Sequence, residues 1–112
     1  MPNLDHAFSA LADPTRRAIL ARLASGEATV MELAEPFEMT QPAISRHLKV
    51  LEGAGLIVRR VEGTKRPCRL APVGIDPIDR WLAMLREALE KNYDRLDEVL
   101  AAMKTGRRKD MP

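Results

Sequence analysis

Hydrophobic positions recur every three or four residues along most of the 112-residue chain, a spacing that predicts a mainly helical protein. The first such stretch, residues 4–11, suits a short helix with one apolar stripe. A second begins at Asp13-Pro14, where Asp is a good N-cap and Pro fits the first helical position, and it ends at Gly26. The side chains expected to face the core from this second helix are Ala18, Ile19, Leu20 and Leu23.

A short third helix is expected after Thr29. Thr29 and Glu32 have the spacing of a capping box, and Pro36 helps to end the helix. The turn Glu38-Met39 then leads to a fourth helix, although this turn lacks the glycine that often occupies it. Short helix, tight turn and longer helix together predict a helix-turn-helix over residues 29–54. The core side chains expected from the third helix are Val30, Met31, Leu33, Ala34 and Phe37.

The fourth helix combines a polar start with an apolar back. Thr40 is a good N-cap, Pro42 sits in the first turn, where a missing N–H costs nothing, and Gly53 and Gly55 close the helix. Its apolar side is formed by Ala43, Ile44, His47, Leu48 and Leu51, which leaves Gln41, Ser45, Arg46 and Lys49 available on the other side.

A β-hairpin is expected after Gly55. Residues 56–62 are rich in β-branched side chains, Gly63-Thr64 provides a turn, and residues 66–71 can return as a second strand. We call residues 56–71 the wing. Pro67 is tolerable at the start of the return strand, since a hairpin of two strands is all edge.

The longest helix is predicted over 77–104, capped by Asp76, because Pro72, Gly74 and Pro77 interrupt the pattern before it. At 1.5 Å per residue it spans roughly 40 Å. Its apolar side chains follow spacings of four and three, and the rest of the chain offers too little surface to cover them, so a second copy is the natural partner. This heptad-like seam consists of Ile78, Leu82, Leu85, Leu89, Asn92, Leu96, Val99 and Met103 and is widened by Trp81, Tyr93 and Leu100.

Charge is distributed unevenly although the net charge is only +2. Residues 40–70 carry seven basic and two acidic side chains, whereas residues 1–39 carry three basic and six acidic ones. A basic run is often just a solvated face. Here it coincides with a helix and a hairpin of the shape that reads duplex DNA, which favours DNA binding.

Composition excludes several other classes of protein. Hydrophobic residues at 46% and charged residues at 30% suit a folded domain, and a single cysteine excludes an intrachain disulfide framework. No apolar run could span a bilayer and the start has no signal-peptide pattern, so we expect a cytoplasmic protein. Nucleophile elbows, phosphate-binding glycine loops and carboxylate–histidine clusters are missing, so an enzyme is not expected. The stronger rival is an interaction module whose basic hairpin binds RNA or a protein.

Three segments together resemble the ArsR-type winged helix-turn-helix transcriptional regulators: ALADPTRRAILARL (10–23), MTQPAISRHLKVLEGAGLI (39–57) and RRVEGTKRPCRL (59–70). The resemblance implies about five helices with a two-stranded wing, in one domain over 1–104, followed by a flexible basic tail at 105–112. It also implies a homodimeric repressor on a palindromic operator, joined through the first and last helices, residues 1–12 and 76–104. The interface residues expected from it are Leu4, Phe8, Ile78, Trp81, Leu82, Leu85, Leu89, Tyr93 and Leu96.

Metal sensing, the best-known trait of that family, is not expected here. The stretch TVMELAEPFEM (29–39) has neither Cys nor His, and residues 76–104 contain no histidine. Neutral imidazole and thiolate ligands are therefore scarce, so we expect no metal site and no cofactor.

Candidate DNA contacts begin with Gln41, Ser45 and Arg46, because Gln pairs well with adenine and Arg with guanine. Lys65 and Arg66, just past the wing turn, are candidates for phosphate or minor-groove contacts. Cys68 lies between two arginines and has two interpretations, a buried inert strand residue or a redox trigger. The full set of predicted DNA-binding residues is Thr40, Gln41, Pro42, Ser45, Arg46, His47, Lys49, Arg60, Lys65 and Arg66.

Overall fold

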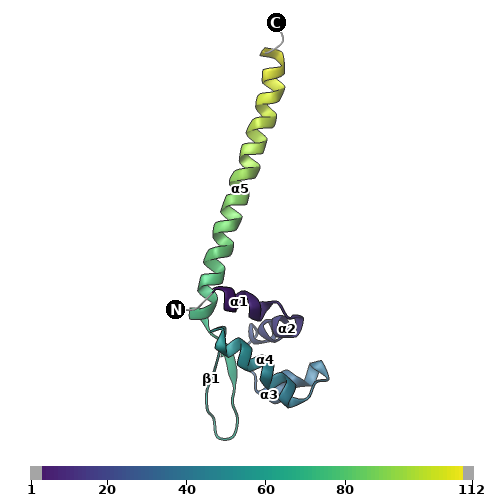
Figure 1. The fold of residues 1–112 in the computed structure, drawn as a ribbon, viewed down its shortest axis with the longest axis vertical. Helices are drawn as coiled ribbons and strands as arrows, with labels where there is room; N and C mark the ends of the chain where they lie inside the picture. Colours follow the sequence, from purple (N-terminus) through teal and green to yellow (C-terminus); the bar gives the residue numbers. More distant parts are fainter. Residues whose placement is uncertain (1–3, 110–112) are drawn as a thin grey trace. The chain divides into compact units, whose positions relative to one another are not determined.

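A computed structural model describes the backbone of residues 4–109 and the side chains of residues 4–104. It confirms the predicted fold class, helical with a small antiparallel hairpin (Figure 1). The described elements are, in order, α1 (Leu4–Leu11), α2 (Pro14–Leu23), α3 (Val30–Ala34), the 3-10 helix η1 (Glu35–Phe37), α4 (Gln41–Gly53), β1 (Ile57–Arg59), β2 (Cys68–Leu70) and α5 (Pro72–Lys109).

The predicted helix caps are present as hydrogen bonds. Asp13 Oδ1 accepts from the backbone N–H groups of Thr15 at 2.8 Å and Arg16 at 3.1 Å. At α3, the Glu32 N–H donates to Thr29 Oγ1 at 3.3 Å and the Thr29 N–H donates to Glu32 Oε1 at 3.0 Å, which is a complete capping box. These side chains satisfy N–H groups that the first turn of a helix leaves without backbone partners.

The core lies around α4, which packs against α1, α2, α3 and β1. Ile44, Leu48 and Leu51 on its inner face have no exposed surface. Each such side chain contributes about 1.5–3 kcal/mol by leaving water. The other side chains that are less than 2% exposed are Ala7, Ala10, Ile19, Leu33, Leu56, Ile57 and Cys68.

The prediction that Met31 and Ala18 face the core is wrong. Met31 is 68% exposed, and Ala18 is also exposed. α3 has only five residues, and Met31 stands two positions before the buried Leu33, so it points to nearly the opposite side. In α2 the inward stripe is set by Ile19 and Leu23, four residues apart, and Ala18 lies beside that stripe.

The last helix begins at Pro72 and not at Pro77, so the predicted cap at Asp76 is also wrong. Gly74 does not break the helix but lets its first turn approach the Gly55 backbone: a Cβ at Gly74 would lie 1.6 Å from the Gly55 oxygen. Pro77 is then the sixth residue of α5, where its missing N–H only leaves the Val73 carbonyl without a helical donor.

The described chain divides into two compact units, residues 4–78 and residues 79–109. The single domain expected over 1–104 stays a prediction. Ile78 is 8% exposed and belongs to the core of the first unit, because α5 starts earlier than expected. Every described side chain from Asp79 to Lys104 is exposed. The backbone of 105–109 is helical, where a flexible tail was expected, and residues 1–3 and 110–112 lie outside the described residues. No helix in 4–109 is long and apolar enough to cross a membrane.

Candidate nucleic-acid interface

The N-terminal half of α4 presents a polar surface as predicted. Thr40 has an extended backbone, with φ −69° and ψ 155°, and its Oγ1 accepts from the Ala43 N–H at 3.3 Å. That cap starts the helix with Gln41 and Pro42 in its first turn. Side chains on the outward side are exposed (Gln41, Pro42, Arg46 and Lys49) or half-buried (Ser45 and His47).

Glu38 makes the turn between η1 and α4. It adopts a left-handed backbone with φ 52° and is the only described residue other than glycine with a positive φ. Left-handed backbone costs an L-residue roughly 1–2 kcal/mol. The turn lies between η1 and α4, and α4 packs against α3 in the core.

His47 faces back toward α2. Its Nδ1 lies 3.4 Å from Arg16 Nη1, and an arginine can only donate, so that ring nitrogen must carry no proton for a hydrogen bond to form. Arg16 also donates from Nε to the Ala10 carbonyl at 2.7 Å and from Nη2 to the Ser9 carbonyl at 3.2 Å. Arg17 Nη1 donates to the Leu11 carbonyl at 2.7 Å. Both arginines therefore hold the end of α1.

The wing is a short hairpin closed by a tight turn. Its register pairs Ile57 with Leu70 and Arg59 with Cys68, and an isolated bridge pairs Glu62 with Lys65 around Gly63, whose φ is 62°. The strands are shorter than predicted because Pro67 accepts from the Arg60 N–H at 3.1 Å but has no N–H to return.

The segment before α3 joins this hairpin as a third strand-like piece. Ala28 and Cys68 exchange two backbone hydrogen bonds, Ala28 N–H to the Cys68 carbonyl at 3.1 Å and Cys68 N–H to the Ala28 carbonyl at 2.8 Å. This bridge was not predicted from the sequence, because one residue pair leaves no alternating pattern.

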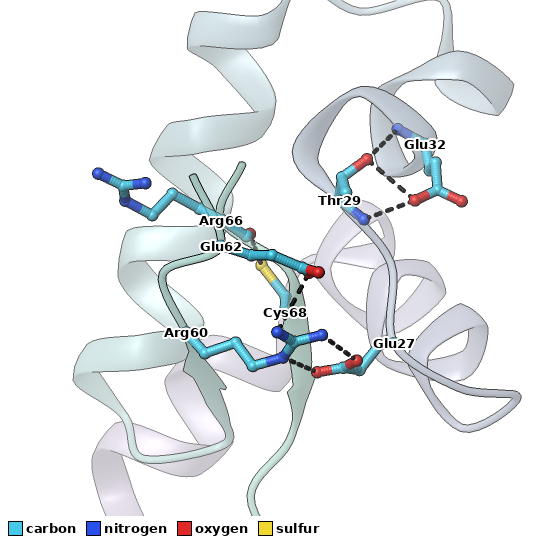
Figure 2. Close-up of polar contacts among 7 residues, drawn as sticks. All are labelled: Glu27, Thr29, Glu32, Arg60, Glu62, Arg66 and Cys68. Atoms are coloured by element: carbon cyan, nitrogen blue, oxygen red, sulfur yellow. Dashed lines mark hydrogen bonds and ion pairs between the residues drawn. The ribbon is translucent and has the colours of Figure 1, made fainter. Parts of the chain in front are cut away.

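Arg60 points to that same segment, as Figure 2 shows. Its Nε and Nη2 donate to the two carboxylate oxygens of Glu27 at 2.8 and 3.0 Å, and its Nη1 lies 3.1 Å from Glu62 Oε2. The hydrogen bond from Arg60 lowers the pKa of the Glu27 carboxyl below its ordinary value. The part played by Glu27 was missed, since Glu27 is 33 residues away in sequence.

A cleft of about 390 Å³ separates the wing tip from the starts of α3 and α4. Predicted DNA-binding residues on both sides meet there: Gln41 and Ser45 from α4, and Lys65 and Arg66 from the wing. Met31, which sequence reasoning placed in the core, also borders it. The complete lining is Thr29, Val30, Met31, Gln41, Ser45, Thr64, Lys65 and Arg66.

Cationic side chains at this surface are exposed and mostly unpaired. In the part of the chain that the structure describes, no carboxylate lies within ion-pair distance of Arg46, Lys49, Lys65 or Arg66. Arg66 Nη1 donates to the carbonyls of Gly63 at 3.3 Å and Lys65 at 3.1 Å. Such cations are available to phosphates, which makes this face suited to a polyanion.

Cys68 is the first residue of β2 in the wing, and its side chain is fully buried. This agrees with the interpretation of Cys68 as a buried strand residue. Its Sγ lies 3.6 Å from the Arg66 carbonyl. Burial raises the pKa of the thiol more than the nearby Arg59 cation lowers it, which disfavours a reactive thiolate. Arg59 itself is 18% exposed, and its Nε lies 3.7 Å from Glu52 Oε1.

The seam on α5 is open beyond Ile78. Its apolar side chains from Leu82 to Met103 are 41–53% exposed, and Trp81 and Tyr93 beside them are 37% and 58% exposed. On α1, Phe8 is 36% exposed while Leu4 is half-buried against the core. No cluster of three or more possible metal ligands occurs among the described residues.

Comparison with known proteins agrees with this geometry. Residues 13–58 match the family model "Bacterial regulatory protein, arsR family". The HTH-type transcriptional regulator Rv2034 of Mycobacterium tuberculosis is 46% identical over 91 residues, covering 81% of this chain and 78% of that protein. The arsenical resistance operon repressor of Escherichia coli is 41% identical over 95 residues, 83% of this chain and 78% of its own length.

A solved structure shows the same fold. The homodimeric winged helix-turn-helix DNA-binding domain Mb0332 of Mycobacterium bovis, described as a possible ArsR-family transcriptional regulator, superposes with a TM-score of 0.61 at 30% identity, covering 79% of each chain. A helix-turn-helix followed by a cationic wing defines a DNA-binding transcriptional regulator. This chain belongs to the ArsR family of bacterial regulatory proteins.

Proposed function

We propose that the protein is a homodimeric repressor that binds a palindromic operator in duplex DNA. The observation that carries the proposal is the cleft in which the exposed polar start of α4 and the cationic wing tip face one another. A helix with exposed polar groups at its start fits the major groove, and a hairpin beside it reaches the neighbouring backbone or minor groove. A function in DNA binding explains why these cations are exposed without carboxylate partners.

The residues at this face divide into two roles. Gln41, Ser45 and Arg46 contact base edges, since they stand on the first two turns of α4. Phosphate contacts come from the N-cap Thr40, from Lys49 and from the wing tip. Pro42 packs beside them in the first turn, and His47 contributes at the edge of the face where Arg16 holds it. The wing-tip residues in this second role are Lys65 and Arg66.

Dimerisation through α1 and α5 supplies the symmetry that a palindrome requires. The half-exposed seam on α5 is too apolar to stay in water, and Phe8 on α1 is also exposed. The related M. bovis domain is homodimeric. Two α4 helices related by a twofold axis would meet half-sites about one helical turn, or 34 Å, apart. The proposed interface is Leu4, Phe8, Trp81, Leu82, Leu85, Leu89, Tyr93 and Leu96, with Ile78 at its edge.

Repression would follow from blocking a promoter, and the E. coli relative is named an operon repressor. The work would take place in the cytoplasm, where the operator lies. We propose no metal effector, since the stretch 29–39 offers neither cysteine nor histidine.

Selection of genomic fragments bound by the purified protein tests this function. We expect a palindromic site with half-site centres about ten base pairs apart, and lower transcription in vitro from a promoter that carries it. Random recovery of genomic fragments, or tighter binding to RNA than to any duplex, would contradict the proposal and favour an interaction module.

A further inference from the structure

Two interactions tie the wing to the segment that starts the helix-turn-helix. At the end of the paired strands nearer the wing tip, where Cys68 lies opposite Arg59, Ala28 and Cys68 exchange two backbone hydrogen bonds. Further toward the tip, Arg60 holds both oxygens of Glu27, as Figure 2 shows. The backbone bridge fixes one point of the hairpin, and the ion pair fixes a second. Together the two contacts restrict rotation of the hairpin about the backbone bridge.

The ion pair between Arg60 and Glu27 lies at the surface and fixes the position of one side chain against the other. Single exposed pairs contribute little, but a bidentate arginine in a network of charges is the exception. Arg60 has such a network, with Glu27 at 2.8 and 3.0 Å and Glu62 at 3.1 Å. Glu62 is itself part of the bridge that closes the wing tip. The arginine therefore connects the tip of the wing to the segment that precedes α3.

That connection sets the width of the cleft. Thr29, two residues after Glu27, is the N-cap of α3 and borders the cleft on one side. Lys65 and Arg66, just after Glu62, border it on the other. Because α3 packs directly against α4, fixing the wing against residue 27 also fixes the wing tip against Gln41 and Ser45.

We propose that Arg60 is a positioning residue for DNA binding: by holding Glu27 and Glu62 it keeps the wing tip at the distance from α4 that a single DNA backbone segment requires. The proposal rests on the proposed function in DNA binding. It gives Arg60 a different role from the direct DNA contact that the sequence predicted, because two carboxylates already occupy its guanidinium group. Lys65 and Arg66 make the contact, and Arg60 holds them in place.

A purely electrostatic effect and a positioning role predict opposite changes in DNA affinity for one variant. Glu27→Gln removes a negative charge close to the DNA-binding face, so Coulomb attraction alone would strengthen binding to DNA. If Glu27 instead holds the wing through Arg60, the same variant weakens operator binding. The matched control is Glu35→Gln, which removes an equal charge from exposed η1.

The affinities of the full-length wild type, E27Q and E35Q for the selected operator duplex are measured at one salt concentration. We expect E27Q to bind about three- to tenfold more weakly than wild type and E35Q to bind equally or slightly better. Binding by E27Q as tight as by E35Q would overturn the proposal.

A second measurement separates wing position from folding and from DNA binding. Arg66→Ala should weaken operator binding several-fold in wild type but have little further effect in E27Q, since the wing is then already misplaced. Without DNA, the amide hydrogens of Ala28 and Cys68 should exchange faster in E27Q than in E35Q. Unchanged exchange together with an unchanged effect of R66A would refute the positioning role. If the wild type binds the selected operator duplex no more tightly than other duplexes, the proposed function is wrong. The exchange rates measured without DNA then still test whether Arg60 positions the wing.

Discussion

Two helices of this chain carry similar apolar stripes with opposite outcomes. On α4, Ile44, Leu48 and Leu51 have no exposed surface, whereas on α5 Leu85, Leu89 and Leu96 are 47–53% exposed. Both stripes follow spacings of three and four residues, with Leu89 and Leu96 seven apart, so periodicity alone does not distinguish them. The difference is that α4 has four neighbouring elements within the chain. The described side chains of α5 beyond Ile78 are all exposed, and we propose that a second copy covers its stripe.

The largest expected effect comes from charging the seam. Leu89→Asp should convert the proposed dimer to a monomer, because association would bury an unpaired carboxylate. Operator affinity should then fall more than about 100-fold, since two half-sites no longer act together. Sedimentation at micromolar concentration measures the first effect and operator titration the second.

Ala83→Asp is the control for that variant, because it adds the same charge to α5 away from the seam. A dimeric L89D protein, or equal losses in both variants, would show that the seam is not the interface.

The second prediction tests the packing of residues 4–78 by comparing two glycines. Gly74→Ala should destabilise the protein by about 3 kcal/mol, because its Cβ would overlap the Gly55 backbone. Gly53→Ala should stabilise it by up to about 1 kcal/mol, since the last residue of α4 has open space around it and no positive φ. Chemical denaturation measures both. Similar stabilities for the two variants would refute the close contact between Gly74 and Gly55.

The third prediction separates the two sides of the cleft. Arg46→Ala should cost about 1–3 kcal/mol on the operator and relax sequence preference at one base pair. Arg66→Ala should weaken binding to all duplexes alike and reduce the slope of log K against log salt by about 1. Affinities for operator and random DNA at several salt concentrations measure both quantities. Equal losses on both DNAs for both variants would contradict this division of roles.

The smallest expected effect lies in the turn before α4. Glu38→Gly should raise stability by roughly 0.5–1 kcal/mol, because glycine adopts a positive φ without the steric cost that Glu38 bears. Thermal unfolding measures it. A loss of stability would mean that the Glu38 side chain makes a contribution larger than its backbone strain.

Local signals in the sequence predicted most of the first unit. The caps at Asp13, Thr29 and Thr40 depend only on residues within three positions, so they were identified correctly. The polar face of α4 follows from the same short-range periodicity. Gly74 contributed to the wrong start predicted for the last helix, because a glycine that permits close packing looks the same in sequence as one that breaks a helix. Only the position of Gly55 in space distinguishes the two.

Long-range pairs in the candidate site were not predictable in this way. In the sequence, Arg60 is one of several basic residues in the wing, and nothing near it identifies Glu27 as its partner. Met31 was misplaced because a five-residue helix is too short for its periodicity to define an inner face. Met31 borders the proposed DNA-binding face, where the identity of exposed side chains is set by the ligand and not by core packing.

The most direct test is the affinity of the dimer for its selected operator and for a scrambled duplex of the same length and composition, measured across a range of salt concentrations. Sequence-specific binding predicts steep salt dependence on both duplexes and a preference for the operator of about 10³-fold or more near 0.15 M salt. Equal affinity for the two duplexes at every salt concentration would contradict a sequence-specific regulator.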